Sequence, residues 1–163
     1  MALTPERIRE IAALTIGQRK NGLWHDYRTN RFTASQFGKI LKLYKDTIEH
    51  GGNRAFHDQK REILARKPPV YATPLVWGEE HEDVAIKEYE KKSGLKIRET
   101  GIWIFPNSHL AASPDGLVLD PADPNKIIGC LEIKCPWRLR NFTSKNTSDW
   151  NAHLDYLDQA NNL

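Results

Sequence analysis

The sequence predicts a mixed α/β domain in which a long helix precedes three antiparallel strands. The helix is predicted over residues 73–92, because Thr73-Pro74 is a helix start signal and Gly94 is a stop signal. Three apolar segments separated by turn-forming residues then read as strands: 95–105, 110–119 and 127–134. The chain has 163 residues, a length that fits a single domain over 1–163.

The composition is that of a well-solvated intracellular protein. Hydrophobic residues make up 39% of the chain, charged residues 28%, and the net charge is +3, which permits nucleic-acid binding without requiring it. Cys130 and Cys135 lie an odd number of residues apart on one strand, so we expect them to face opposite ways as buried, unpaired thiols of a reducing compartment. Residues 1–5 contain no signal-peptide pattern and no apolar run approaches membrane length, so we expect neither secretion nor membrane contact.

The first helix is predicted to begin at Thr4. Thr4 is a suitable N-cap, and Pro5 and Glu6 fit the first turn and the positive end of the helix dipole. The helix should end near Gly17, and its apolar stripe would consist of Ile8, Ile11, Ala12 and Leu14.

Arginines and hydroxyl groups meet before the next predicted helix. Arg28 and Arg31 precede Thr33 and Ser35, which lie at a helix start that continues through Phe37, Ile40 and Leu41. Such a start offers free backbone N–H groups and a favourable dipole for an anion. Taken alone, the stretch favours an ordinary cap beside surface arginines over a phosphate site.

Residues 42–72 give weaker signals. A turn is predicted at Gly51-Gly52-Asn53 and a helix over 56–65, anchored by Ile63 and Leu64. The following basic residues form either a solvated face or a contact with a DNA backbone: Lys60, Arg61, Arg66 and Lys67.

The predicted helix 73–92 is rich in acids. Val84 or Ala85, together with Tyr89, is expected to face the core. Acids near a helix N-terminus usually interact with the dipole, which accounts for Glu79 and Glu80.

The two later strands bring acidic groups together. Pro114 cannot donate to a sheet and Gly116 tolerates unusual dihedral angles, so Ser113–Gly116 is predicted to be a turn or a bulge entering a strand. Alternation along the last strand divides its side chains into an apolar face (Ile127, Leu131, Ile133) and a second face (Ile128, Cys130, Glu132, Lys134). A hairpin would bring Asp115 alongside Glu132 and Lys134.

Two carboxylates and a lysine in this order suit a metal-dependent phosphodiesterase. Asp115 and Glu132 supply the hard oxygen ligands that Mg²⁺ prefers, with Mn²⁺ as an alternative. The metal would hold the phosphate and lower the pKa of a bound water, which Lys134 would orient or deprotonate. A Glu-x-Lys sequence by itself is usually a solvated strand face, so the surrounding motifs decide.

Those motifs resemble a known family. Ala111-Ala112-Ser113-Pro114-Asp115-Gly116-Leu117 and Leu131-Glu132-Ile133-Lys134-Cys135-Pro136 match the central motifs of the lambda-exonuclease and YqaJ-type viral recombinase group within the PD-(D/E)xK nuclease superfamily. Arg28 with Thr33-Ala34-Ser35 matches a further motif of that group, Arg…Thr-Ala-Ser. The resemblance spans about 24–140 and is weak through 42–72.

The resemblance implies a restriction-endonuclease-like core, an N-terminal helical phosphate-binding part over 1–45 and a catalytic core over 73–136. It adds Glu82 to the metal site through the spacing from Gly78, with Glu79 as the fallback, and it adds the Ile133 carbonyl. It also assigns DNA phosphate contacts, including the 5′-terminal phosphate, to the motif of Arg28, Thr33 and Ser35, and it places Arg140 at the offset of a family arginine. By position alone, Arg138 and Arg140 form either phosphate contacts or an ordinary basic loop, and Arg31 is a further candidate phosphate contact.

The function expected from the resemblance is a Mg²⁺-dependent 5′–3′ exonuclease that acts on duplex DNA ends in recombination or viral DNA processing. The expected partners are DNA, a single-strand-annealing protein and further copies in a trimeric ring. The family has another helix and strand beyond the Glu-x-Lys strand, so we expect either a C-terminally truncated chain or a missing part that is supplied elsewhere. Two alternatives stay open: a fragment that binds DNA or a partner without cutting, and an endonuclease or repair nuclease of the same superfamily.

Overall fold

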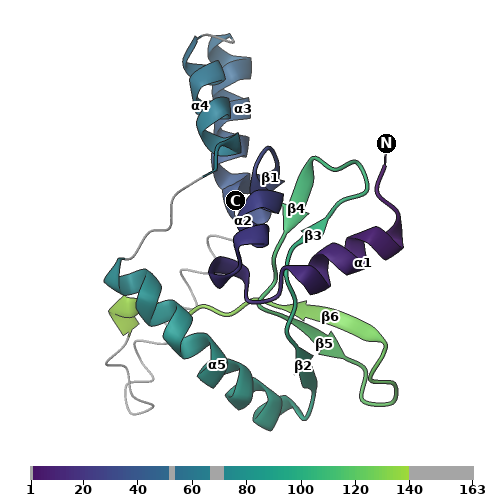
Figure 1. Ribbon diagram of the computed structural model, residues 1–163. Coiled ribbons are helices and arrows are strands. Elements are labelled where there is room, and N and C mark those ends of the chain that lie inside the picture. The colour runs from purple at the N-terminus through teal and green to yellow at the C-terminus, as the bar shows by residue number, and fades with distance from the viewer. Residues whose placement is uncertain (1, 52–53, 67–71, 140–163) are drawn as a thin grey trace.

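The structure, a computed structural model, describes residues 2–51, 54–66 and 72–139 (Figure 1). Its helices, in chain order, are α1 (Pro5–Leu14), the 3-10 helix η1 (Gln18–Lys20), α2 (Gly22–Arg28), η2 (Ala34–Gln36), α3 (Phe37–His50), α4 (Arg54–Leu64), α5 (Thr73–Ser93) and η3 (Trp137–Leu139). The strands are β1 (Phe32–Thr33), β2 (Lys96–Arg98), β3 (Trp103–Ile104), β4 (Leu110–Ala112), β5 (Gly116–Leu119) and β6 (Ile127–Leu131). The mixed α/β class predicted from the sequence is confirmed.

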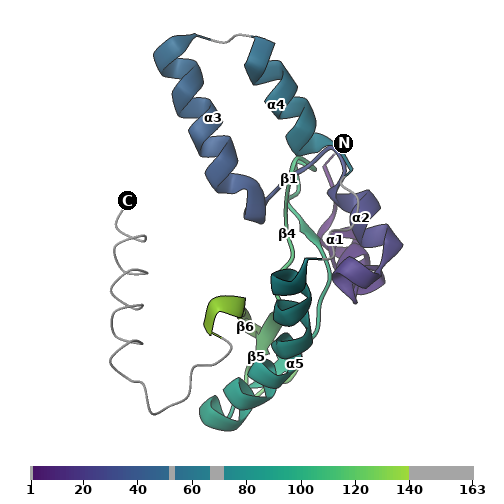
Figure 2. The same ribbon diagram turned by 90° about the vertical axis from the view of Figure 1, so that its left-hand side faces the viewer.

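The strands form two small sheets with the orders β1-β4-β3 and β2-β5-β6. β2, β5 and β6 pair antiparallel as a meander that follows α5 directly, and α5 contacts β2 and η3 (Figures 1 and 2). The predicted order of a helix and three antiparallel strands is therefore present. β1 joins the other sheet by parallel pairing with β4, a contribution that the sequence did not indicate.

The predicted continuous strands 95–105 and 110–119 are wrong in one respect, since each is interrupted. Arg98 pairs with Leu117 and Trp103 pairs with Ala112, so the two halves keep the same antiparallel register. Between these pairs the hairpin opens, and each strand is divided between the two sheets.

The N-terminal part takes over the hydrogen bonds of the opened hairpin. The Gly101 N–H donates to the Ala12 carbonyl (3.0 Å), and the Ile102 N–H donates to the Thr15 hydroxyl (2.9 Å). The Gln18 amide donates to the carbonyls of Thr100 (3.2 Å) and Pro114 (2.8 Å). Buried backbone groups need partners, and here the partners lie about 85 residues earlier in the chain, which strand periodicity alone does not reveal.

One face of α1 packs on β3 and completes a small core. The core cluster comprises Ile11, Trp24, Ile102, Ile104 and Ala111, with Leu3 and Tyr27 packed against it. Thr4 caps α1 as predicted, its side chain accepting from the Arg7 N–H. The predicted place of Leu14 in the apolar stripe is wrong, because Leu14 is 48% exposed. Thr15 is buried there instead, since its hydroxyl bridges the Ile11 carbonyl and the Ile102 N–H.

α3 and α4 form a helical hairpin that projects from the rest of the molecule (Figures 1 and 2). α4 confirms the helix predicted over 56–65, and its anchor Ile63 is buried. The helix predicted after Ser35 is also present, although Phe37 and Leu41 on it are each 53% exposed.

α5 matches its prediction closely at both ends. Gly94 ends the helix in a left-handed conformation (φ 73°), and its N–H donates to the Glu90 carbonyl. Ala85 and Tyr89 are half-buried, whereas Val84 is exposed and does not face the core. No helix in the described ranges is long and apolar enough to cross a membrane.

The last predicted strand is shorter than expected and its outer end is solvated. β6 ends at Leu131, and Ile127 and Ile128 are both exposed, beside an irregularity in the β5–β6 register. Cys130 and Cys135 are unpaired as predicted, but Cys130 is exposed, so the expectation that both thiols are buried is wrong.

Gly116 is required for a different reason than the predicted one. Its φ is not positive, but a Cβ there would overlap Cγ2 of Ile97 on β2. The close approach of β5 to β2, and hence the position of the preceding Asp115, depends on the absence of a side chain.

Candidate nuclease site

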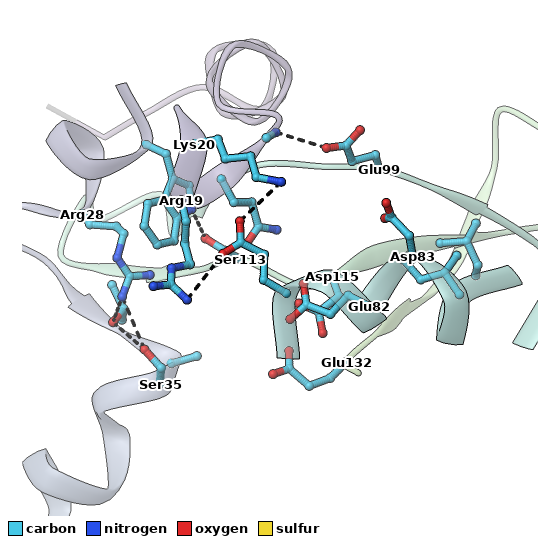
Figure 3. Close-up of a pocket in the computed structure, with 18 residues that line it drawn as sticks. Arg19, Lys20, Arg28, Ser35, Glu82, Asp83, Glu99, Ser113, Asp115 and Glu132 are labelled. Carbon is cyan, nitrogen blue, oxygen red and sulfur yellow. Dashed lines mark hydrogen bonds and ion pairs between the residues drawn. The ribbon is translucent and has the colours of Figure 1, made fainter. Parts of the chain in front are cut away.

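A pocket of about 790 Å³ lies where the N-terminal part, α5 and the open hairpin meet (Figure 3). Six acidic and three basic side chains line it, a formal excess of three negative charges: Glu79, Glu82, Asp83, Glu99, Asp115 and Glu132 against Arg19, Lys20 and Arg28. Thr33, Ser35 and Ser113 also line it. Figure 3 shows Glu82, Asp115 and Glu132 gathered at one end, with Arg28 and Ser35 at the other.

Asp115 is fixed at the acidic end of the pocket by hydrogen bonds to the end of β6 and the residues just past it. The Asp115 N–H donates to the Leu131 carbonyl (3.0 Å), and the Ile133 N–H donates to its carboxylate. The hairpin therefore brings Asp115 beside Glu132–Lys134, as predicted from the two motifs. Pro114 and Gly116 on either side set the turn into β5.

Burial and neighbouring acids raise the pKa of two carboxyl groups at this end, Glu82 and Asp115. Burial raises the pKa of Glu82, and the negative charges of Asp115 and Glu79 add to the effect. Burial also raises the pKa of Asp115, and Glu132 adds to it, although the hydrogen bond from Ile133 acts in the opposite direction. The Cys135 thiol is affected by the same negative charges, since burial and then the charges of Glu82 and Asp115 raise its pKa. Negative charge is concentrated here more than the nearby cations offset.

Glu132 and Lys134 lie just past the end of β6, at the rim of the pocket. The Lys134 Nζ donates to the Glu132 carboxylate, so the two side chains share a face as predicted. Lys134 itself is largely exposed and is not among the pocket-lining residues.

The donors at the acidic end suit a hard divalent cation in kind. Three carboxylates supply oxygen ligands, and a bound cation would offset the burial and negative charge that raise the pKa of Glu82 and Asp115. Within the described part of the chain, however, no three acidic, histidine or cysteine side chains are already arranged to hold a metal ion. The Glu132 carboxylate accepts a hydrogen bond from Lys134.

Arg28 forms the basic end of the pocket. Its guanidinium lies over the Trp24 ring (4.2 Å to the ring centre) and donates to the hydroxyls of Thr33 (3.4 Å) and Ser35 (3.5 Å). Burial lowers the pKa of Arg28, and among the described residues no carboxylate pairs with it. A half-buried cation with long hydrogen bonds and neutral partners is a suitable site for an anion.

The other predicted phosphate contacts lie elsewhere. Arg31 donates to the Tyr27 carbonyl (2.7 Å) and does not line the pocket, so the structure does not bring it to Arg28 and Ser35. Arg138 is exposed on η3, outside the pocket lining. Arg140 lies outside the described residues.

The pocket also contains residues that the sequence reasoning missed. Arg19 and Lys20 on η1 pair with Glu79 at 3.8 and 3.4 Å, so the fallback acid Glu79 is engaged by cations while Glu82 faces Asp115. Trp24 connects the basic end of the pocket with the segment before Asp115, because its indole N–H donates to the Ser113 hydroxyl (2.9 Å). The only sequence signal was the basic pair Arg19-Lys20 between two helices.

The fold and this pocket define a mixed α/β domain with one pocket that has an acidic end and a basic end. The sequence matches the YqaJ-like viral recombinase domain over residues 23–160. No curated protein matches it. The chain belongs to the YqaJ-like viral recombinase family, a lambda-exonuclease-like family of the PD-(D/E)xK superfamily, as the sequence motifs predicted. Membership of this family indicates a nuclease.

Proposed function

We propose that this protein is a Mg²⁺-dependent deoxyribonuclease, with Mn²⁺ as an alternative, that degrades duplex DNA from a 5′-phosphorylated end. The observation that supports this most is the division of a single pocket into an acidic end, at Glu82, Asp115 and Glu132, and a basic end, at Arg28 and Ser35 (Figure 3). We further propose that α5 and the β2-β5-β6 meander correspond to the restriction-endonuclease-like core of the superfamily.

The acidic end would bind the metal through the carboxylates of Asp115, Glu132 and Glu82 and the Ile133 carbonyl. A bound Mg²⁺ would supply charge for the scissile phosphate and a water of lowered pKa. The three carboxylates at the acidic end support this requirement, since a DNA phosphate placed against them would be repelled without divalent cations. Lys134, beside Glu132, would orient the attacking water.

The basic end would hold the terminal phosphate. Arg28 would exchange its long bonds to Thr33 and Ser35 for charge-assisted bonds to phosphate oxygens, while the hydroxyls remain as additional donors. The Trp24 ring beneath Arg28 restricts the guanidinium to this orientation. An end bound here and a phosphodiester at Asp115 would lie in the same pocket, which favours exonuclease action over internal cutting.

The experiment compares linear duplexes carrying a 5′-phosphate or a 5′-hydroxyl with circular duplex, each in Mg²⁺ or EDTA. We expect degradation of the linear forms only, loss of activity in EDTA, and faster degradation of the phosphorylated form. Arg28→Ala should erase the phosphate preference, at a cost of about ten- to a hundred-fold in rate, the contribution of one charge-assisted hydrogen bond. Equal wild-type rates on both linear duplexes would contradict the 5′-end assignment, and cutting of the circle would favour an endonuclease.

A second function remains a candidate because of one observation. Among the described residues, no three acidic, histidine or cysteine side chains are arranged to hold a metal ion, and the Glu132 carboxylate accepts a hydrogen bond from Lys134. A protein that binds DNA ends without cutting them would retain the basic end and leave the acids in this arrangement. DNA binding without degradation in Mg²⁺ or Mn²⁺, at any enzyme concentration, would favour that function.

A further inference from the structure

We propose that Lys20 and Arg19 form a third phosphate-binding element in this pocket, and that Glu79 occupies it in the free protein as a substitute for a DNA phosphate. The proposal extends the proposed function, because it adds a contact for the bound strand between the acidic and basic ends. Neither residue belongs to the motifs that relate the chain to its family.

The first argument is position. η1 places Arg19 and Lys20 on the pocket wall, and Figure 3 shows Arg19 between Arg28 and Glu82. Gln18 fixes η1 against the open hairpin through the carbonyls of Thr100 and Pro114. A strand that reaches from Arg28 to Asp115 would therefore pass these two side chains.

The second argument is the anion that is already present. The Glu79 carboxylate lies 3.8 Å from an Arg19 nitrogen and 3.4 Å from the Lys20 Nζ, within a pocket. Two cations converging on one carboxylate define a position suited to an oxyanion. A phosphate has more acceptor oxygens than the carboxylate and can engage both cations.

The third argument is the looseness of the pairs. Both separations are longer than a charge-assisted hydrogen bond of about 2.8 Å. The Lys20 side chain is 79% exposed and that of Glu79 is 30% exposed, so the pairs are accessible to solvent and salt. Exposed pairs of this kind contribute only about 0–1 kcal/mol, so a phosphate can displace the carboxylate readily.

The alternative is a purely structural role, in which Glu79 tethers η1 to α5. The two roles predict opposite effects of Glu79→Gln on DNA affinity. If Glu79 competes with phosphate, its neutralisation should tighten binding by up to about five-fold, the contribution of an exposed ion pair. If Glu79 is a tether, its neutralisation should loosen η1, weaken binding and lower the melting temperature.

The test measures binding of a fluorescent 5′-phosphorylated duplex by anisotropy in EDTA, so that metal-dependent cutting does not intervene. We expect Lys20→Gln to reduce the slope of log affinity against log salt by about 0.9, the value for one phosphate contact. Lys96→Gln is the matched control: Lys96 is 76% exposed and pairs loosely with Glu90 at 3.7 Å, but it does not line the pocket. We expect Lys96→Gln to leave the slope unchanged.

A second arm identifies the phosphate. Each of the first three internucleotide phosphates from the 5′ end is replaced in turn by a neutral methylphosphonate. We expect one replacement to weaken wild-type binding by about ten-fold, the lower end of a charged hydrogen bond, and to have no such effect on Lys20→Gln.

The proposal is overturned if every replacement weakens the wild type and Lys20→Gln equally, or if Glu79→Gln weakens binding. These binding results do not depend on catalysis. A protein that cuts DNA but shows no linkage-specific effect would refute this inference alone, and one that shows the effect without cutting would refute only the nuclease proposal.

Discussion

At the scale of single residues, the site depends on a few side chains held in unfavourable electrostatic surroundings. Glu82 and Asp115 each have a raised pKa because burial and neighbouring acids oppose their ionisation. Arg28 has a lowered pKa because it is partly buried, and no carboxylate among the described residues pairs with it. Such groups reduce folding stability, and their retention in one pocket is typical of a functional site.

Neutralising Glu82 should therefore stabilise the metal-free protein. A raised pKa means that the folded state binds the proton more strongly than the unfolded state, so its stability falls as pH rises from the ordinary carboxyl pKa through the folded one. In EDTA at neutral pH, Glu82→Gln should melt above the wild type, and the difference should close in acid. Glu88→Gln, at an exposed position on the same helix, is the control. A lower melting temperature for Glu82→Gln at neutral pH would contradict this account.

Lys134→Ala should abolish cleavage and retain DNA binding. Lys134 contacts the Glu132 carboxylate and is largely exposed, whereas affinity depends on many phosphate contacts. We expect cleavage to fall by at least about a hundred-fold, the contribution of a positioned proton-transfer group. A digestion assay beside a gel shift measures both, with Lys126→Ala, an exposed lysine paired with Asp120, as control. Parallel loss of both activities would count against the assigned role.

At the scale of elements, the interrupted hairpin between β2-β3 and β4-β5 builds the site. Its register is continuous, but residues 99–102 and 113–115 do not pair across it. Their backbone groups instead form hydrogen bonds with the N-terminal part of the chain, where Gln18 donates and where Thr15 and Ala12 accept. The opening turns Ser113 and Asp115 into the pocket beside Glu99. The irregular backbone of the site is thus stabilised by the N-terminal part of the chain.

Gly116→Ala should test the close contact that supports this geometry. The added methyl group would overlap Ile97 Cγ2, at a cost of about 1–3 kcal/mol of unfolding free energy, as for other overpacked positions. Gly129→Ala, where a Cβ would lie 3.7 Å from Val118 Cγ2, should be tolerated. Denaturant titrations compare the two variants. Combining Gly116→Ala with Ile97→Ala should recover part of the overlap cost, and additive losses would argue against a direct clash.

At the scale of the whole molecule, the pocket joins segments that are far apart in the chain. η1 and α2 contribute the cations, α5 contributes Glu79 and Glu82, and the meander contributes Asp115 and Glu132. The hydrogen bond from Trp24 to Ser113 connects the basic part with the acidic part. Metal binding at the acidic end should therefore stabilise the fold as a whole.

We expect MgCl₂ to raise the melting temperature, because a ligand that binds only the folded state stabilises it. At a hundred times the dissociation constant the gain is about 2.7 kcal/mol, which corresponds to about 5–10 °C for a domain of this size. Asp115→Asn should reduce the rise, and NaCl at equal ionic strength is the control. An equal rise in Asp115→Asn would place the stabilising ion elsewhere.

Sequence by itself determined the elements and the chemistry that local patterns encode. The helix predicted over 73–92 ends at Gly94 because glycine adopts the left-handed conformation easily, and the order of helix and meander follows from periodicity and turns. The motifs around Asp115, Glu132 and Arg28 identified the family, because the residues of each motif lie close together in the sequence.

Only the tertiary structure decided which of these residues share a pocket. It brought Arg28, Thr33 and Ser35 into the same pocket as Glu82, Asp115 and Glu132, left Arg31 outside, and added Arg19 and Lys20, which pair with Glu79. It also buried Thr15 in place of Leu14 and divided two predicted strands between two sheets. The reason is physical: hydrogen bonds from η1 and α1 to the open hairpin and ion pairs from η1 to α5 link positions about 60 to 100 residues apart, and no periodicity within one segment encodes a partner at that distance.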